Sequence, residues 1–313
     1  MLVARRLLSV GMELLGERCE LVTGGLDATP ERLLELAPGA AAIVADPAVA
    51  VGERLLDAAG PQLRVVANFA VGYDNVDVDA CVRRGIVVTN TPDVLTNATA
   101  ELALALSLAA ARRMSDAEAD LRAGHWAGWD PGAYLGLELS GASFGVVGMG
   151  RIGRRYAELV AGFAGEIVYT SRAPRPDAER ELGAIQLSLE ELLRRADVVS
   201  LHLPATEETA GIIGREEIAL MKPHAILVNT ARGALIDAAA LASALGAGEL
   251  GAAGLDVYEG EPRVPAPLLE APRCVLLPHI GSATTRAREA MARLAAENVI
   301  AALGGSEPPN RVA

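Results

Sequence analysis

Residues 144–153 read FGVVGMGRIG, a short apolar run followed by glycines in a GxGxxG spacing. The run is typical of a buried strand, and residues 151–164 have a helical pattern. Gly148 permits a tight turn, Gly150 lets a pyrophosphate approach the backbone, and Gly153 lets the helix pack closely on the strand. The unpaired N–H groups at a helix N-terminus attract phosphate. The stretch therefore predicts a dinucleotide-binding turn that opens a βαβ unit.

Apolar runs of strand length continue from this stretch in both directions and alternate with helical patterns. Strands are expected after it at 167–170, 198–203, 225–229, 253–257 and 275–277, and before it at 41–46, 64–70 and 86–90. Continuous apolar strands that alternate with helices indicate parallel sheets covered on both faces. The sequence therefore predicts an α/β protein.

Two long helical patterns divide the chain. The first, residues 96–113, is apolar on nearly all sides, so we expect it to be buried between domains or subunits. The second, residues 284–303, lies near the end of the chain and is expected to return to the first domain. The predicted plan is a discontinuous domain, residues 1–95 plus 284–313, and an inserted dinucleotide-binding domain, residues 96–283.

Composition restricts the partners. Lys and Arg number 28 and Asp and Glu 40, a formal charge of −12, which disfavours binding to nucleic acid. The three cysteines are far apart in sequence and form neither a disulfide framework nor a zinc-ligand cluster, so no metal is expected. No apolar stretch has the length of a membrane span, and the N-terminus lacks a signal-peptide pattern. We expect a cytoplasmic protein.

The strand after the glycine turn bears on the choice of dinucleotide. NAD sites usually place Asp or Glu at the end of this strand, on the ribose 2′-hydroxyl. Here residues 169–175 read YTSRAPR and contain no carboxylate. Ser171 can donate to a phosphate, and Arg172 or Arg175 can pair with it. A solvated basic loop is the alternative. We expect NADP(H) to be preferred, with NAD(H) possible.

Three ionisable residues follow the ends of three later strands. Ligands of open α/β sheets bind beyond these ends, where Arg232, Glu261 and His279 are expected to converge. Singly they could be a surface ion pair, a loop acid and a helix cap. Together they suit reduction of a 2-oxo acid, because Arg232 can bind its carboxylate, His279 can protonate the new alkoxide, and Glu261 can hold the imidazole ring.

The chain resembles the D-specific 2-hydroxyacid dehydrogenase family, most closely its glyoxylate/hydroxypyruvate reductase branch. The resemblance rests on motifs in family order, at residues 70–77 (AVGYDNVD), 91–96, 98–102, 148–153, 231–233, 254–257 (GLDV), 261–262 and 278–283 (PHIGSA). It implies two doubly wound parallel-sheet domains, a flavodoxin-like substrate domain and a Rossmann dinucleotide-binding domain, with the active site between them. It also implies a homodimer.

The resemblance assigns roles residue by residue. It makes His279 the acid/base, Glu261 its partner and Arg232 the substrate anchor. It places the backbone N–H groups of Val71 and Gly72 on the substrate carboxylate. Residues expected to line the substrate pocket are Leu95 and Trp129, the latter from the neighbouring subunit, and residues expected to line the cofactor are Thr99, Arg151, Ile152, Thr230, Ala231, Asp256 and Gly281.

These observations predict an NADP(H)-dependent reductase that converts glyoxylate or hydroxypyruvate to the D-2-hydroxy acid by hydride transfer. One alternative is an NAD-dependent dehydrogenase of another, bulkier D-2-hydroxy acid. A different alternative is a non-catalytic protein that senses dinucleotides, which the acidic charge disfavours.

Overall fold

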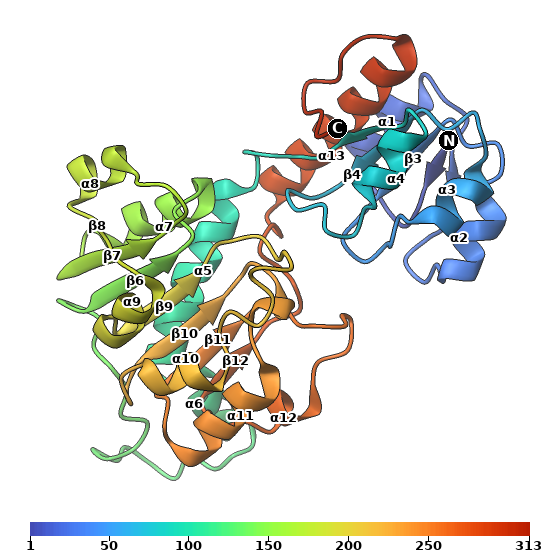
Figure 1. Cartoon of the computed structure of the whole chain (residues 1–313). Helices are drawn as coiled ribbons and strands as arrows, with labels where there is room; N and C mark the ends of the chain where they lie inside the picture. The colour runs from blue at the N-terminus through green and yellow to red at the C-terminus, as the bar shows by residue number, and fades with distance from the viewer. The chain divides into compact units, whose positions relative to one another are not determined.

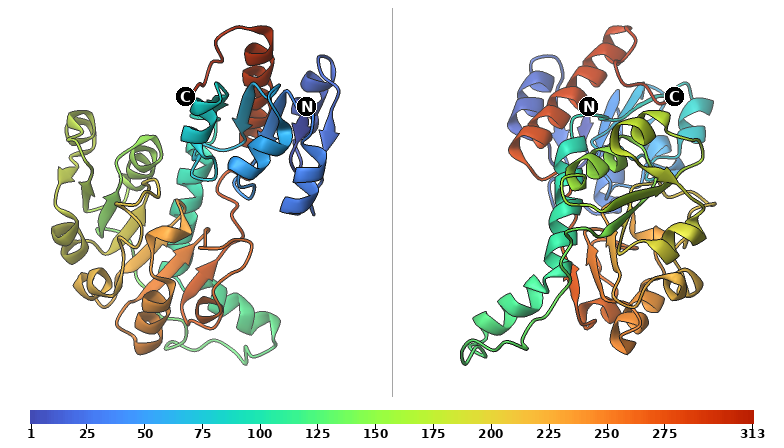
Figure 2. Two further views of the ribbon diagram at one scale, coloured as in Figure 1. Left: turned by 45° about the vertical axis from the view of Figure 1, so that its right-hand side comes forward. Right: turned by 90° about the vertical axis from the view of Figure 1, so that its left-hand side faces the viewer.

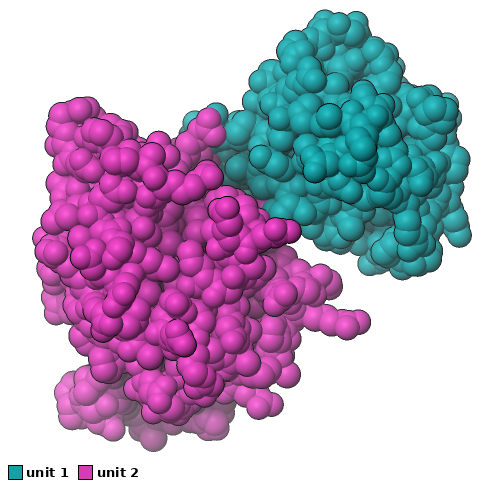
Figure 3. All heavy atoms as spheres, in the orientation of Figure 1, with its two compact units in different colours: residues 1–95, 282–313 teal, residues 96–281 magenta.

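The computed structural model describes all 313 residues, which form two compact units (Figure 3). Unit 1 comprises Met1–Leu95 and Ser282–Ala313, and unit 2 comprises Thr96–Gly281. The sequence prediction had put the second boundary after Ala283. Each unit is built around one parallel sheet with helices on its faces (Figure 1), so the predicted α/β fold is confirmed.

Unit 1 contains a five-stranded parallel sheet in the order β2-β1-β3-β4-β5. Its strands are β1 (Leu2–Val3), β2 (Val22–Thr23), β3 (Ala42–Ala45), β4 (Val65–Asn68) and β5 (Val87–Thr89), and its helices are α1 (Ser9–Gly16), α2 (Pro30–Leu36), α3 (Glu53–Ala59), α4 (Val78–Arg83) and α13 (Thr285–Gly304). The sequence analysis missed β1 and β2, because a strand of two residues has no readable periodicity.

Helix α13 belongs to unit 1 although it lies near the end of the chain. The Thr284 hydroxyl caps it by accepting a hydrogen bond from the N–H of Ala287. Its buried face packs against α1 and β4 (Figure 2), so the last segment completes the fold that the first 95 residues begin. None of the helices combines the length and the apolar character that crossing a bilayer requires.

Unit 2 contains a seven-stranded parallel sheet in the order β12-β11-β10-β9-β6-β7-β8. Its strands are β6 (Ser143–Val147), β7 (Glu166–Thr170), β8 (Ile185–Gln186), β9 (Val198–Leu201), β10 (Ile226–Asn229), β11 (Ala252–Leu255) and β12 (Cys274–Leu276), and its helices are α5 (Thr96–Ala111), α6 (Met114–Arg122), α7 (Arg151–Val160), α8 (Pro176–Leu182), α9 (Leu189–Arg195), α10 (Arg215–Leu220), α11 (Ala238–Ala247) and α12 (Ala266–Leu269), with a 3₁₀ turn, η1, at Gly233–Leu235.

Both faces of this sheet are buried. Along β6, Val146 points into one hydrophobic core and Val147 into the other, and the other strands alternate in the same way, except the edge strand β8, whose Ile185 is exposed. Strand β6 pairs with β7 on one side and with β9 on the other, so the chain reverses its direction of winding here. Such a switch point is where open α/β sheets bind ligands, beyond the carboxyl ends of the strands.

Helix α5 packs on β10, β11 and α7 of its own unit. Gly254 on β11 makes the approach possible, because a Cβ there would lie 3.0 Å from the Cβ of Leu106. This packing accounts for much of the apolar surface noticed at residues 96–113. The helix ends at Ala111, and α6 and the segment after it project from the rest of unit 2 (Figure 2).

Candidate active site

The GxGxxG segment forms the turn between β6 and α7. Gly148 has a φ of +97°, and a Cβ there would lie 2.8 Å from the carbonyl carbon of His202. A Cβ on Gly153 would lie 2.1 Å from the carbonyl oxygen of Gly148, so the helix needs glycine to approach the strand. Around Gly150 the space is open, and no side chain caps α7. An open cradle at an uncapped helix N-terminus fits a pyrophosphate group.

The other residues expected to line the cofactor also belong to unit 2. Thr230 directly follows β10, and its hydroxyl is buried without a hydrogen-bond partner. A buried hydroxyl without a partner is rare in proteins, and a bound dinucleotide would supply one. Thr99 on α5 donates to the carbonyl of Gly281 at 3.3 Å. The N–H of Ala231 is already bonded to the Asn229 side chain at 2.9 Å. Arg151 and Ile152 begin α7.

The segment after β7 is held by hydrogen bonds of its own. The Ser171 hydroxyl donates to the carbonyl of Ala173 at 2.6 Å, and the buried Tyr169 hydroxyl accepts from the N–H of Arg175 at 2.8 Å. Arg172 and Arg175 are exposed, and neither forms a salt bridge. Arg154 on α7, by contrast, is bound by three carboxylates, those of Glu158, Asp177 and Glu181. Two arginines on this segment are thus available to an anion.

Glu261 and His279 form a hydrogen-bonded pair. The Nδ1 atom of His279 lies 2.6 Å from Oε2 of Glu261, and the other oxygen, Oε1, accepts the N–H of Tyr258 at 2.9 Å. Both side chains are partly exposed. The Nε2 atom of His279 has no partner within the chain. The carboxylate therefore orients the ring and leaves one ring nitrogen for a ligand.

The electrostatic environment favours a charged Glu261. Burial raises its pKa, but the hydrogen bonds from His279 and Tyr258, together with the charges of His279 and Arg232, outweigh that effect. The pKa of Glu261 consequently lies below its ordinary value of 4.5. Arg232 follows β10, where the Asn229 side chain donates to its carbonyl at 2.8 Å. The structure thus places the cation near the acid–histidine pair.

Asp256 holds the loop that carries His279. Its completely buried carboxylate accepts the N–H groups of Ile280 and Gly281, each at 2.7 Å, while its carbonyl accepts the N–H of His279 at 2.9 Å. Burial raises the pKa of Asp256, and the two N–H bonds oppose it. His279 itself has a φ of +53°, a left-handed conformation that is unusual for residues other than glycine. The loop is therefore held by Asp256 in a strained form.

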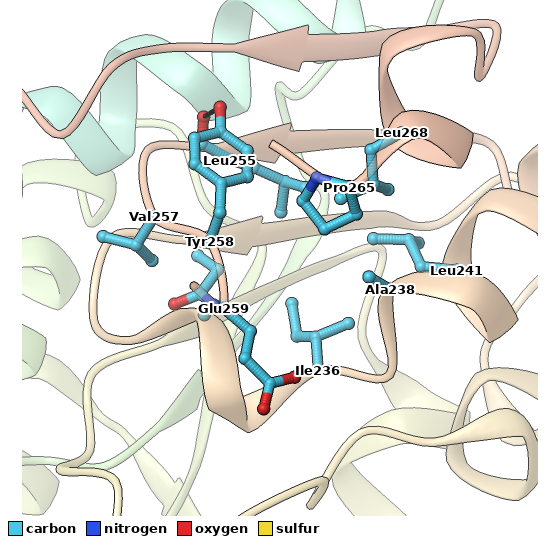
Figure 4. A pocket seen from close by; sticks show the side chains of 11 residues that line it. Ile236, Ala238, Leu241, Leu255, Val257, Tyr258, Glu259, Pro265 and Leu268 are labelled. Carbon is cyan, nitrogen blue, oxygen red and sulfur yellow. Dashed lines mark hydrogen bonds between the residues drawn. The ribbon is translucent and has the colours of Figure 1, made fainter. Parts of the chain in front are cut away.

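Two further residues, which sequence reasoning missed, organise the same edge. The Tyr258 hydroxyl contacts the carbonyls of Leu255 at 3.2 Å and Leu277 at 2.9 Å, so it connects the ends of β11 and β12. A Cβ on Gly233 would lie 1.9 Å from the carbonyl carbon of Tyr258, so the loop of Arg232 needs glycine here. Both residues also line a small cavity (Figure 4), whose other lining side chains are mainly apolar. The cavity admits about one water molecule, which is too little space for a substrate.

The remaining predicted residues belong to other segments of the chain. Val71 and Gly72 belong to the loop after β4 of unit 1, and Leu95 is the buried last residue of that part of the unit. Trp129 lies in the segment after α6, with 85% of its surface exposed. His202, predicted inside a strand, follows the last residue of β9 and packs its backbone against the glycine turn.

Comparison with known proteins identifies the family of the chain. Residues 104–281 match the family model described as "D-isomer specific 2-hydroxyacid dehydrogenase, NAD binding domain". A glyoxylate reductase of Thermococcus litoralis is 50% identical over 266 residues, which cover 84% of this chain and 80% of the relative. The crystal structure of a protein from Thermus thermophilus superposes with a TM-score of 0.93, at 46% identity, over 100% of this chain and 99% of that one.

An NADPH-dependent glyoxylate/hydroxypyruvate reductase from Sinorhizobium meliloti, solved with NADP and malonate, is 36% identical, with a TM-score of 0.88, and the match covers 100% of this chain and 96% of the other. The family model alone spans more than half of the residues, and the likeness to the relatives covers both units. The chain therefore belongs to the D-isomer specific 2-hydroxyacid dehydrogenase family.

Proposed function

We propose that this dehydrogenase is an NADP(H)-dependent reductase that converts glyoxylate or hydroxypyruvate to the D-2-hydroxy acid. The observation that carries the proposal is the Glu261–His279 pair, which leaves Nε2 of the histidine open at the sheet edge that also holds the glycine turn. The relatives named glyoxylate reductase, at about half of all positions identical, support the choice of substrate.

Each residue of the site has its own role in the proposed reaction. A nicotinamide dinucleotide bound at the glycine turn supplies the hydride. His279 donates the proton from Nε2 to the carbonyl oxygen of the 2-oxo acid, and Glu261 stabilises the charged ring through Nδ1. Arg232 binds the oxo acid and stabilises the negative charge that develops on its oxygen. The carbonyl carbon gains the hydride and its oxygen gains the proton, so the product is the 2-hydroxy acid.

The preference for NADP(H) rests on the segment after β7. No carboxylate follows the strand to bind a ribose 2′-hydroxyl, and the exposed guanidinium groups of Arg172 and Arg175 can bind a 2′-phosphate. Ser171 can contribute its N–H or turn its hydroxyl from the carbonyl of Ala173. The NADPH-dependent relative from S. meliloti supports the same preference.

Unit 1 is proposed to bind the carboxylate of the substrate, and unit 2 the dinucleotide. The N–H groups of Val71 and Gly72 donate to no acceptor within the chain, which suits an anion. Leu95 and Trp129 are proposed to limit the size of the substrate. A bulkier 2-hydroxy acid is the alternative.

We further propose a homodimer in the cytoplasm. The segment 114–138 projects from unit 2 and exposes apolar side chains, with Trp129 85% and Trp126 60% exposed, which a second copy of the chain can cover. The cysteines are unpaired, as suits a reducing compartment. Light scattering of the wild type and of Trp129→Asp tests the dimer, which is wrong if both have the monomer mass.

Steady-state kinetics tests the activity. Glyoxylate, hydroxypyruvate and larger 2-oxo acids are each assayed with NADPH and with NADH, for the wild type and for His279→Ala. We expect turnover of the two small substrates with NADPH, and a loss of about 10²–10⁴-fold in the variant while dinucleotide binding persists. Undiminished turnover by His279→Ala, or a preference for larger oxo acids, would refute the proposal.

A further inference from the structure

The loop after β4 is held by its carbonyl groups. The carbonyl of Ala70 accepts the N–H of Thr91, that of Val71 accepts Nδ2 of Asn90, and that of Gly72 accepts Nδ2 of Asn68, each at 2.8 Å. Three successive carbonyls are thus bonded, whereas the N–H groups of Val71 and Gly72 have no acceptor in the chain. The N–H groups of Ala70 and Tyr73 have no acceptor either, so this stretch of the loop offers several donors to a ligand.

A planar peptide links each carbonyl to the next N–H group. In a trans peptide the two point in opposite directions, so a bond that fixes the carbonyl also aims the N–H. The Ala70 carbonyl, held by Thr91, therefore aims the N–H of Val71. The Val71 carbonyl, held by Asn90, aims the N–H of Gly72.

Both asparagines are held in place by further hydrogen bonds. Asn68 ends β4, is completely buried, and is bonded to the side chain of Asn75, which also donates to the carbonyls of Asp46 and Val49. The backbone of Asn90 is bonded to two parts of the C-terminal segment, namely the side chain of Asn298 on α13 and the carbonyl of Asn310. The donors are thus fixed before any ligand arrives.

We propose that Asn90 is a positioning residue for the substrate carboxylate, acting through the Val71–Gly72 peptide, and that Asn68 supports it by holding the following peptide. The inference rests on the proposed function, in which the N–H groups of Val71 and Gly72 bind that carboxylate. A side chain that merely stabilised unit 1 would affect folding without affecting the affinity for the carboxylate.

The test compares Asn90→Ala with wild type. The methyl group of alanine cannot bond the Val71 carbonyl, and Asn90 is only half-buried, so the variant should fold. Loss of one hydrogen bond of this kind should raise KM for glyoxylate, and Kd for the unreactive dianion oxalate, by about threefold to tenfold. The KM for NADPH and the kcat should stay within twofold. Asn90→Ser, whose hydroxyl is too short to reach Val71, should behave in the same way and replaces the alanine variant if that does not fold.

The matched control is Gln62→Ala. The Gln62 side chain also donates to a backbone carbonyl of unit 1, that of Ala59, but it is exposed and precedes β4 rather than following it. Its loss should leave KM for glyoxylate unchanged. An equal rise in KM for this variant would show that any lost amide–carbonyl bond in unit 1 has the effect, and would overturn the proposal.

Amide resonances of the NADPH-bound wild type separate the inference from the function on which it rests. Titration with oxalate should move the Val71 and Gly72 resonances. If neither moves at saturation, the carboxylate binds elsewhere, and the proposed substrate contact falls together with this inference. If both move but Asn90→Ala binds oxalate as tightly as wild type, the contact stands and the positioning role of Asn90 is wrong.

Discussion

Asp256 should decide whether His279 keeps its conformation. The two bonds from its carboxylate to the N–H groups of Ile280 and Gly281 are charge-assisted and contribute about 1.5–3 kcal/mol each, or about 3–6 kcal/mol together. A left-handed conformation such as that of His279 costs about 1–2 kcal/mol in a residue that has a Cβ. The bonds outweigh the strain, so the wild-type loop is held.

Asp256→Asn removes the excess of hydrogen-bond energy over the cost of the His279 conformation. An asparagine can accept one of the two N–H groups and turns its NH₂ toward the other, so one neutral bond worth about 0.5–1.5 kcal/mol remains. That value is comparable with the cost of the left-handed conformation of His279. A large share of the molecules should therefore have His279 in another conformation. Because a displacement of about 1 Å at a reacting group can reduce the rate about 100-fold, kcat/KM for glyoxylate should fall by about that factor.

Kinetics and thermal unfolding together test this expectation. The substitution also removes a buried charge whose desolvation opposes folding, so the loss in the free energy of unfolding should be smaller than the energies of the lost bonds alone suggest. The matched control is Asp237→Asn, since Asp237 also accepts two backbone N–H groups, at the start of α11. The reasoning is refuted if Asp256→Asn retains kcat/KM within threefold of wild type, or if the control loses as much.

Three more substitutions probe the site and its surroundings. Glu261→Gln keeps the shape of the side chain but removes the negative charge that stabilises a positively charged His279 ring during proton transfer, so kcat for glyoxylate should fall about tenfold; an unchanged kcat would contradict this. Arg172→Ala should raise KM for NADPH about ten- to hundredfold and leave KM for NADH within twofold, and equal effects on both cofactors would exclude the proposed phosphate contact. Burial lowers the pKa of His202 to about 3 from an ordinary 6.5, so the unfolded chain is protonated first as pH falls, and the free energy of unfolding should decline by up to about 1.4 kcal/mol per unit below pH 6.5. Urea unfolding at several pH values should show a shallower decline for His202→Gln, and an identical slope would count against a neutral buried ring.

The parts of the site that follow from strand order were predictable from the sequence. In a parallel sheet all strands end at one edge, so residues that follow strands converge whatever the loops between them do. Glu261 and His279 illustrate this, because they are 18 residues apart and yet form a bond of 2.6 Å. The GxGxxG turn was predictable from its glycines, since Gly148 and Gly153 are each required by a close backbone contact and the open space around Gly150 leaves room for a phosphate.

Contacts that depend on the register of neighbouring strands were not predictable. The bonds of the Tyr258 hydroxyl depend on β11 and β12 pairing so that Leu255 lies beside Leu276, and no local pattern encodes that pairing. The partner of Gly233 was not predictable either, because Tyr258 comes from another loop. The one usable signal was the glycine directly after Arg232, which indicates a close approach of backbones without naming the partner.

The two units hold their proposed ligand-binding groups in the same way. In unit 2 the carboxylate of Asp256 holds the backbone next to His279, and in unit 1 the amides of Asn68 and Asn90 hold the backbone of Val71 and Gly72. In both, buried or half-buried polar side chains hold a loop outside the regular hydrogen bonds of helix and strand. Such loops contribute little to the cores, which consist of the strands and helices behind them. Substitution of an anchor should therefore reduce activity more than stability, whereas substitution in the cores should do the reverse.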